Sequence, residues 1–140
     1  MTSATPTALF VCTHNAGRSA LAAALARLRG GELINAESAG VDPADIPSAA
    51  AIASLAELGI DGSAHQPSAI TEQRIRDADV VVAMKPGLDV PQLTGVRYET
   101  WSLPDPAGWD VDGIRPLRDE IDTRVQQLLV ELIGQQSTAT

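Results

Sequence analysis

Eight consecutive residues, from Cys12 to Ser19, carry the side chains with the clearest chemical potential in this sequence. They read Cys12, Thr13, His14, Asn15, Ala16, Gly17, Arg18 and Ser19. A short apolar run precedes them and an Ala- and Leu-rich helical pattern follows, so they are predicted to form a turn from a strand into a helix. In such a turn, backbone N–H groups converge on one point, and the helix dipole adds positive potential there. We therefore expect the residues from Thr13 to Ser19 to bind a tetrahedral oxyanion.

The side chains of this segment suit an anion site with a nucleophile. Arg18 offers a planar fork that can hold two oxygens of a phosphate-like ligand. Asn15 and Gly17 are residue types that tolerate the left-handed backbone of a tight concave loop. Cys12 is expected at the floor of the loop, where a thiolate is favoured over a thiol, and Ser19 can donate its hydroxyl to that thiolate. The segment predicts a cysteine nucleophile beneath an oxyanion pocket.

A structural interpretation of Cys12 competes with the catalytic one. Most cytosolic cysteines are small buried residues, and the end of a strand is an ordinary place for one. An arginine six residues after a cysteine also arises by chance. The predicted strand before the segment and helix after it, with Asn15, Gly17 and Ser19 between them, favour catalysis.

A second candidate group is Asp105, which lies between two prolines just after the last predicted strand. A carboxyl group on this rigid loop could act as general acid to a leaving oxygen. Because Pro, Asp and Gly all favour turns, the segment around Asp105 could also be a simple turn. Together with the Cys12 segment, we favour the general acid.

The remaining polar and aromatic candidates are weaker. We expect His14 at the pocket rim and His65 in an exposed loop. One cysteine and two histidines give no cluster of familiar metal-ligand spacing, so we expect no metal and no bound cofactor. Tyr98, Trp101 and Trp109 either wall a substrate pocket or only pack as partly buried side chains.

The elements that must position these groups alternate between strand and helix. Strands are predicted at residues 8–12, 33–38, 79–84 and 96–103. Helices are predicted at residues 18–29 and 48–58, in a short segment from residue 71, and at residues 114–133. This alternation indicates an α/β fold with three layers, in which helices flank a four-stranded parallel sheet. Ligands of such sheets bind beyond the carboxyl ends of the strands, where Cys12 is placed.

Composition narrows the classes of partner and compartment. The chain has 140 residues, which we expect to form a single domain over 1–140. Its net charge of −8 argues against nucleic acid or an anionic membrane as a partner. No membrane span and no secretory leader are recognisable, and the single cysteine excludes an internal disulfide, so we expect a cytoplasmic protein.

The segment from Cys12 to Ser19 resembles the signature loop of the low-molecular-weight protein tyrosine phosphatases and of the arsenate reductases that share their fold. The likeness extends over nearly the whole chain, through residues 37–40, 58–61, 78–82, 105–106 and 115–121. It implies the flavodoxin-type strand winding of that fold. The loop, residues 105–108 and residues 115–121 look most like the mycothiol-dependent arsenate reductases. The phosphatases usually carry aromatic residues after the Asp-Pro, where this chain has Ala107 and Gly108.

The resemblance implies a mechanism. Cys12 attacks the arsenic of arsenate, Asp105 helps a water or hydroxide to leave, and Arg18 with the loop amides holds the oxyanion. A small thiol such as mycothiol then forms an adduct, and a redoxin completes the reduction to arsenite. Thioredoxin-coupled relatives use two further cysteines after the third strand. Residues 84–90 contain none here, so a reductase of this kind requires an external thiol.

Two other functions remain open from the sequence. The same loop and acid would serve a phosphatase of phosphotyrosine or other aryl phosphates, in which water resolves the cysteine intermediate. A third possibility is an oxyanion-binding protein without turnover, against which the intact set of Cys12, Arg18, Ser19 and Asp105 argues. Residues 20–21 and 85–86 depart from the patterns usual in the reductases.

Overall fold

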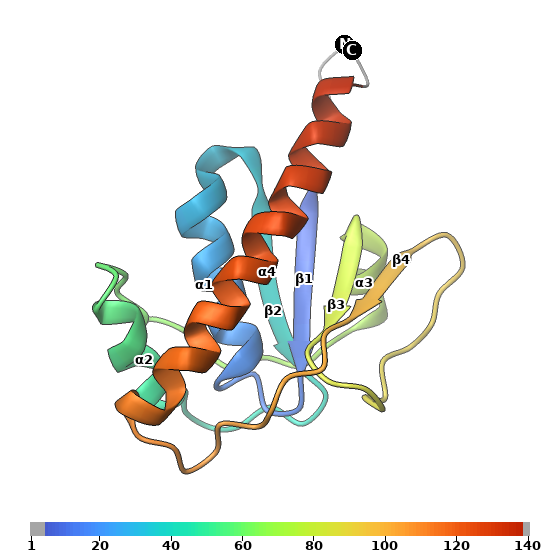
Figure 1. Cartoon of the computed structure of the whole chain (residues 1–140). Coiled ribbons are helices and arrows are strands. Elements are labelled where there is room, and N and C mark those ends of the chain that lie inside the picture. Colours follow the sequence, from blue (N-terminus) through green and yellow to red (C-terminus); the bar gives the residue numbers. More distant parts are fainter. Residues whose placement is uncertain (1–4, 139–140) are drawn as a thin grey trace.

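A computed structural model describes residues 5–138 of the chain, with side chains as far as residue 134. Its four strands all pair in parallel in the order β2-β1-β3-β4 (Figure 1). Their bounds are β1 Thr7–Cys12, β2 Asn35–Gly40, β3 Val80–Ala83 and β4 Arg97–Thr100. This order is that of the flavodoxin-type winding, which confirms the predicted fold class.

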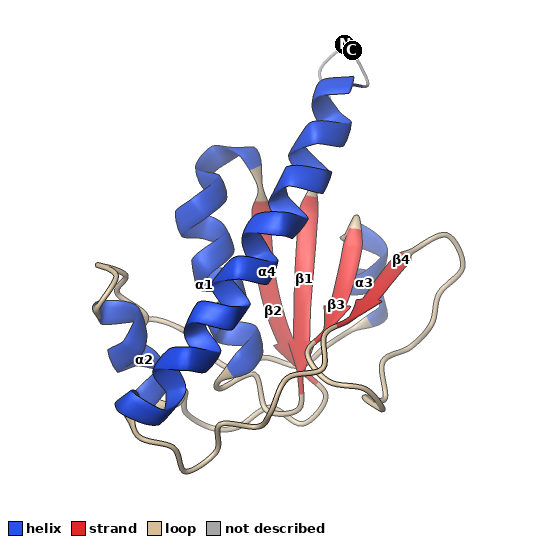
Figure 2. Ribbon diagram, viewed as in Figure 1, coloured by secondary structure: helices blue, strands red, loops and turns tan. Residues whose placement is uncertain are grey.

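Helices cover both faces of the sheet, so the molecule has three layers (Figure 2). On one face lie α1, α2 and α4, and on the other lies α3. The bounds are α1 Arg18–Gly30, α2 Ala49–Ala56, α3 Glu72–Asp77 and α4 Val111–Thr138. Among the described residues, no helix has both the length and the apolar character needed to cross a membrane.

The central strand β1 is buried on both sides, which explains its uninterrupted apolar sequence. Ala8 and Phe10 pack in the core formed with α1 and α4. Leu9 and Val11 face the opposite way and pack in the smaller core with Ile75 of α3. Because β1 is fixed from both faces, its last residue is a rigid place for a functional side chain.

Some of the predicted helix and strand boundaries agree with the structure, and others differ from it. Ser48 and Thr71 cap α2 and α3 through their side-chain oxygens, at the residues where these two helices were predicted to begin. The second strand was predicted too early, because residues 31–33 form a turn of 3-10 helix and β2 starts only at Asn35. The fourth strand is shorter than predicted, since it is an edge strand that pairs only with the four residues of β3. Helix α4 begins before the predicted Ile114 and extends beyond the predicted end at residue 133.

An ion-pair cluster joins α4 to the end of α2. Glu57 accepts hydrogen bonds from Arg115 at 2.9 and 2.6 Å and from Arg118 at 2.7 Å. These bonds, those of Arg115 foremost, lower the pKa of Glu57 from 4.5 to about 2. The carboxylate therefore stabilises the fold above pH 4.5, and this contribution disappears as the pH falls towards 2.

We expect Glu57→Gln to lower the free energy of unfolding at pH 7 and to flatten its pH dependence between pH 5 and 2. The effect should be small, because the carboxylate is exposed and screened by solvent. Urea unfolding of both proteins at pH 7 and at pH 3 measures it. Glu32→Gln, at an exposed glutamate of the 3-10 turn, serves as the control. Equal losses of stability on acidification in wild type and Glu57→Gln would contradict the assignment.

Candidate active site

The thiol of Cys12 lies at the carboxyl end of β1 and is buried. Its Sγ is 2.9 Å from Oγ of Ser19, in the first turn of α1, and accepts the N–H of Asn15 at 3.2 Å. Ser19 Oγ accepts a hydrogen bond from Nδ2 of Asn15 at 2.8 Å and lies 3.5 Å from the carbonyl oxygen of Ala39. The shorter contact favours donation of the hydroxyl proton to sulfur. Two donors then face Sγ, an arrangement that stabilises a thiolate.

Asn15 holds the loop from behind. It is fully buried and is the one non-glycine residue with positive φ, 53°, in the described chain. Such a conformation costs a residue with a Cβ about 1–2 kcal/mol. Two hydrogen bonds of the Asn15 side chain offset this cost: Nδ2 donates to Oγ of Ser19, and Oδ1 accepts the N–H of Ser68 at 3.0 Å. The prediction of left-handed backbone at Asn15 is therefore confirmed.

The same prediction for Gly17 is wrong, because its φ is −127°. Space for a side chain at this position is tight instead. A Cβ on Gly17 would lie 3.1 Å from Cγ of Pro106, in the segment that follows β4. The absent side chain lets the Asp105 segment close over the loop.

The loop carbonyls turn away from the thiol. Four of them accept backbone N–H groups of residues 41–48 at 2.8–3.1 Å: Cys12 from Val41, Thr13 from Asp42, His14 from Ala44, and Ala16 from Ser48. Because an amide N–H points opposite to the carbonyl of the same peptide plane, the N–H groups of the loop turn inward. The converging donors that an oxyanion site needs are thus fixed from the outside.

His65 completes this outer support. Its Nε2 lies 2.7 Å from the carbonyl oxygen of Asn15, and since a carbonyl only accepts, Nε2 carries the proton. The side chain is half-buried, so the prediction of an exposed loop residue is wrong. The signal was absent from the local sequence, because Asn15 and His65 are fifty residues apart.

Gly40, at the end of β2, lies directly against the loop. An added Cβ would stand 2.8 Å from the carbonyl oxygen of Thr13 and 3.0 Å from the amide nitrogen of Asn15. Both are backbone atoms, so the loop itself would have to move. The glycine at the end of β2 therefore fixes how closely this strand supports the loop from Cys12 to Ser19.

We expect Gly40→Ala to destabilise the fold by about 1–3 kcal/mol, as overpacking does, and to weaken the binding of inorganic phosphate. Urea unfolding and phosphate titration by calorimetry measure the two effects. Gly134→Ala is the matched control, because a Cβ at Gly134 meets nothing within 4 Å. Wild-type phosphate affinity in Gly40→Ala would show that the loop does not depend on this contact.

A pocket of about 70 Å³ opens above the thiol. Its lining residues come from the loop, from the start of α2 and from the segment after β4: Cys12, His14, Ala16, Gly17, Arg18, Ser48, Asp105, Pro106 and Ala107. His14 is exposed here, as predicted for a rim residue, and its Nδ1 lies 2.9 Å from the carbonyl oxygen of Asp42. Thr13, Asn15 and Ser19 lie behind the lining and support it.

Arg18 and Asp105 meet at this pocket. The side chain of Arg18 is buried, and its Nη1 donates to the carbonyl oxygen of Leu103 at 3.2 Å. Its Nη2 is 4.0 Å from Oδ1 of Asp105, whose side chain is 58% exposed. Asp105 also accepts the N–H of Ala107 at 3.1 Å. The guanidinium therefore lies beneath an accessible carboxylate, and both border the space above Cys12.

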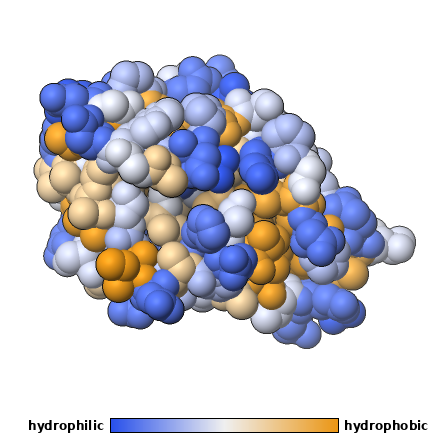
Figure 3. Space-filling model, turned by 90° about the horizontal axis from the view of Figure 1, so that it is seen from below, coloured by the Kyte–Doolittle hydropathy of each residue, from blue (hydrophilic) through white to orange (hydrophobic). Residues whose placement is uncertain are grey.

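Sequence reasoning did not place Ser48 in the lining, because the start of α2 comes beside the loop only through the fold. Pro106 and Ala107 line the pocket next to the predicted Asp105. The aromatic candidates do not line the pocket: Trp101 packs against Phe10 with ring centroids 5.8 Å apart. The face at the carboxyl ends of the strands mixes hydrophilic residues with separate apolar patches (Figure 3). Among the residues described, no three His, Cys, Asp or Glu side chains are placed to hold a metal ion.

The chain is similar to a known protein family and to individual members of it. The family model described as low molecular weight phosphotyrosine protein phosphatase matches residues 7–89. The glutaredoxin arsenate reductase of Synechocystis sp. is 31% identical over 127 residues, which are 89% of this chain and 96% of that protein.

Two of the similar solved structures illustrate the shared fold. The thioredoxin-dependent arsenate reductase of Corynebacterium glutamicum matches with a TM-score of 0.79 and 32% identity, over 93% of this chain and 62% of that one. The YwlE arginine phosphatase from Geobacillus stearothermophilus matches with a TM-score of 0.80 and 28% identity, over 96% and 97% of the two chains. The chain is an enzyme that belongs to the low molecular weight phosphotyrosine protein phosphatase family, and its relatives include arsenate reductases.

Proposed function

We propose that this chain is a single-domain arsenate reductase that uses Cys12 as its nucleophile and an external small thiol as its reductant. One observation carries the proposal: the Cys12 sulfur accepts the N–H of Asn15 and lies 2.9 Å from the Ser19 hydroxyl, at the floor of a loop whose carbonyls point outward. Similarity to arsenate reductases at about 30% identity supports the choice of arsenate.

In the first step, the Cys12 thiolate attacks the arsenic of arsenate. A sulfur–arsenic bond forms, an arsenic–oxygen bond breaks, and the oxygen leaves as water after taking up a proton. Arsenic stays As(V), so this step involves no oxidation or reduction. Arg18 and the loop amides hold the remaining oxygens of arsenate and neutralise the negative charge on them.

Asp105 is the proposed source of the proton for the leaving oxygen. Its carboxyl borders the pocket together with Cys12, and its exposure allows it to exchange protons with solvent. The hydrogen bond from Ala107 and the adjacent Pro106 fix its position. A group held so close to the leaving oxygen is suited to general acid catalysis.

The reduction itself needs two electrons, which two thiols supply when they become a disulfide. This chain has one cysteine, so further thiols must come from outside. A small thiol such as mycothiol attacks the arsenic of the Cys12 adduct and releases Cys12. A redoxin thiolate then attacks the sulfur of the thiol–arsenate adduct, forming a mixed disulfide, and the sulfur–arsenic electron pair stays on arsenic as As(III).

A phosphatase is the second candidate, favoured by the likeness to an arginine phosphatase. It would use the same loop and acid on an aryl phosphate or a phosphorylated side chain, with water to resolve the intermediate. The small oxyanion pocket and the absence of aromatic residues at Ala107 and Gly108 support arsenate over an aryl substrate. An oxyanion-binding protein without turnover is the third candidate.

The proposal is tested by measuring arsenite formation while each reductant is left out in turn. The purified protein receives arsenate with mycothiol alone, with a mycothiol-dependent redoxin alone, or with both, and arsenite is measured by arsenic speciation. We expect arsenite at a catalytic rate only when both are present. Equal arsenite formation without the small thiol would reject the proposed route, and no arsenite under any condition would reject the reductase.

A further inference from the structure

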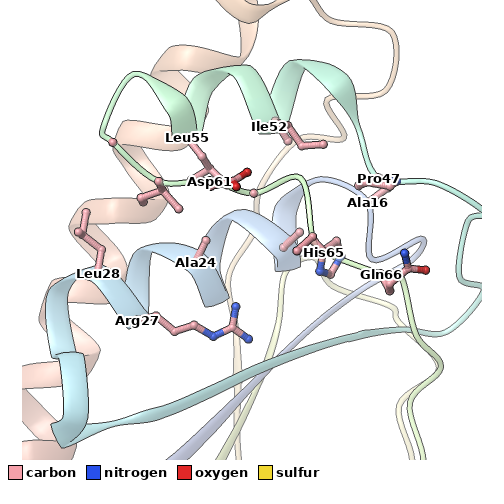
Figure 4. A pocket seen from close by; sticks show the side chains of 16 residues that line it. Ala16, Ala24, Arg27, Leu28, Pro47, Ile52, Leu55, Asp61, His65 and Gln66 are labelled. Carbon is pink, nitrogen blue, oxygen red and sulfur yellow. The ribbon is translucent and has the colours of Figure 1, made fainter.

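A second cavity, of about 630 Å³, is shown in Figure 4 and shares the lining residue Ala16 with the oxyanion pocket. It is bounded by α1, by α2 and by residues 59–66, which follow α2. Its volume falls within the range of about 300–1,000 Å³ that small-molecule sites occupy. The oxyanion pocket has a volume of about 70 Å³, which suits a small anion. The larger cavity, named here the thiol groove, is not used in the mechanism above.

The groove exists because α1 presents only small side chains to it in its first two turns. Ala20 and Ala24 lie one turn apart on α1 along the floor, and Ala16 precedes them in the loop before the helix. Arg27 and Leu28 line the far end. Side chains four residues apart normally form the ridge that fills the space between packed helices. Ile52 and Leu55 point from α2 towards this gap and form the opposite wall (Figure 4). The result is an open apolar floor and wall rather than a packed helix contact.

The groove leads to the oxyanion pocket. Ala16 borders both cavities, and Pro47 of the groove is followed by Ser48 of the pocket. His65, another wall residue of the groove, donates to the carbonyl oxygen of Asn15 in the oxyanion loop. A molecule lying in the groove therefore has one end at the rim of the space above Cys12.

The polar residues of the groove balance in charge. Arg27 is a cation and Asp61 an anion, while Gln66 and His65 supply further hydrogen-bonding groups. Arg27 already donates through Nε and Nη2 to the carbonyl oxygen of Ala36, at 3.1 and 2.7 Å. This lining suits a neutral or zwitterionic molecule with amide and hydroxyl groups, and disfavours a polyanion in a chain of net charge −8.

We propose that the thiol groove binds the low-molecular-weight thiol that resolves the Cys12 adduct. This inference rests on the proposed function, because only a one-cysteine reductase needs a small thiol at this place. The bound thiolate attacks arsenic, a new sulfur–arsenic bond forms, and the bond between arsenic and Cys12 breaks. The electron pair of the broken bond returns to the Cys12 sulfur, and arsenic remains As(V). The body of the thiol stays along the alanine floor during the step.

Binding of unreactive thioethers tests the groove without any turnover. S-methylmycothiol and S-methylglutathione are titrated into the protein by calorimetry, for wild type and for Ala24→Phe, which fills the floor. Ala53→Phe is the matched control, since Ala53 is exposed on α2 and does not line the groove. If Ala24→Phe fails to fold, Ala64→Trp fills the groove from an exposed wall residue.

We expect at least one thioether to bind wild type and the Ala53→Phe control equally, and to bind the filled-groove variant at least about tenfold more weakly, a loss typical of misfit in a pocket. Binding of neither thioether to wild type, or equal binding to wild type and the filled-groove variant, would overturn the groove assignment. Arsenite assays stay separate: thioether binding in a protein that forms no arsenite would reject the proposed reductase, and with it the resolving step, and would leave the groove only as a binding site for small thiol derivatives.

Discussion

Replacement of Cys12 by serine is expected to abolish turnover and to leave anion binding intact. The loop amides and Arg18 do not depend on the sulfur, so inorganic phosphate should bind with nearly unchanged affinity. A serine hydroxyl beside Asn15 and Ser19 lacks a base that would ionise it, so the nucleophile is lost. We expect the rate of arsenite formation to fall by more than about 10⁴-fold, as for other lost nucleophiles.

Two measurements on Cys12→Ser separate chemistry from folding. Phosphate titration by calorimetry reports whether the loop keeps its shape, and arsenic speciation reports the rate. Retained phosphate binding with no arsenite supports the nucleophile. Substantial arsenite formation by Cys12→Ser would remove Cys12 from the mechanism.

Replacement of Asp105 by asparagine should lower the turnover rate by roughly 10²–10⁴-fold, the range typical of a lost general acid. The asparagine oxygen can still accept the N–H of Ala107, so the local turn should persist. We expect a loss in kcat with little change in the KM for arsenate, because Arg18 and the loop amides remain. Steady-state kinetics with saturating thiol and redoxin measure both constants.

Asp110→Asn is a close control for this experiment. Asp110 lies in the same connection between β4 and α4, and its Oδ1 accepts the N–H of Gly113 at 2.8 Å in a similar way. It does not border the pocket. An equal effect of both variants would point to the charge of the segment rather than to acid catalysis, and an unchanged rate in Asp105→Asn would make its turn purely structural.

The sequence was a good guide wherever the deciding interaction is local. The apolar run before Cys12, the capping side chains of Ser48 and Thr71, and the alternation of strands and helices all follow from neighbouring residues. The bounds of β2 and β4 were less predictable, because they depend on the pairing partner of each strand and on the adjacent turns. Leu33 illustrates this: its apolar side chain suggested a strand, but it belongs to a 3-10 turn.

The support that His65 gives the candidate site could not be predicted, because it joins distant segments. His65 contacts the loop from Cys12 to Ser19 at Asn15, fifty residues away in the sequence. Gly17 was singled out for backbone freedom, yet its importance lies in the approach of Pro106. Asn15 was predictable, since few other residue types combine left-handed backbone with two side-chain hydrogen-bonding groups.

A side-by-side assay of the purified protein tests the central proposal most directly. One arm supplies arsenate with mycothiol and its redoxin, and the other an aryl phosphate without any thiol; Cys12→Ser is run in both. We predict thiol-dependent arsenite formation in the first arm that vanishes in Cys12→Ser. Thiol-independent release of phosphate in the second arm, with arsenate acting only as an inhibitor, would contradict the reductase and identify a phosphatase.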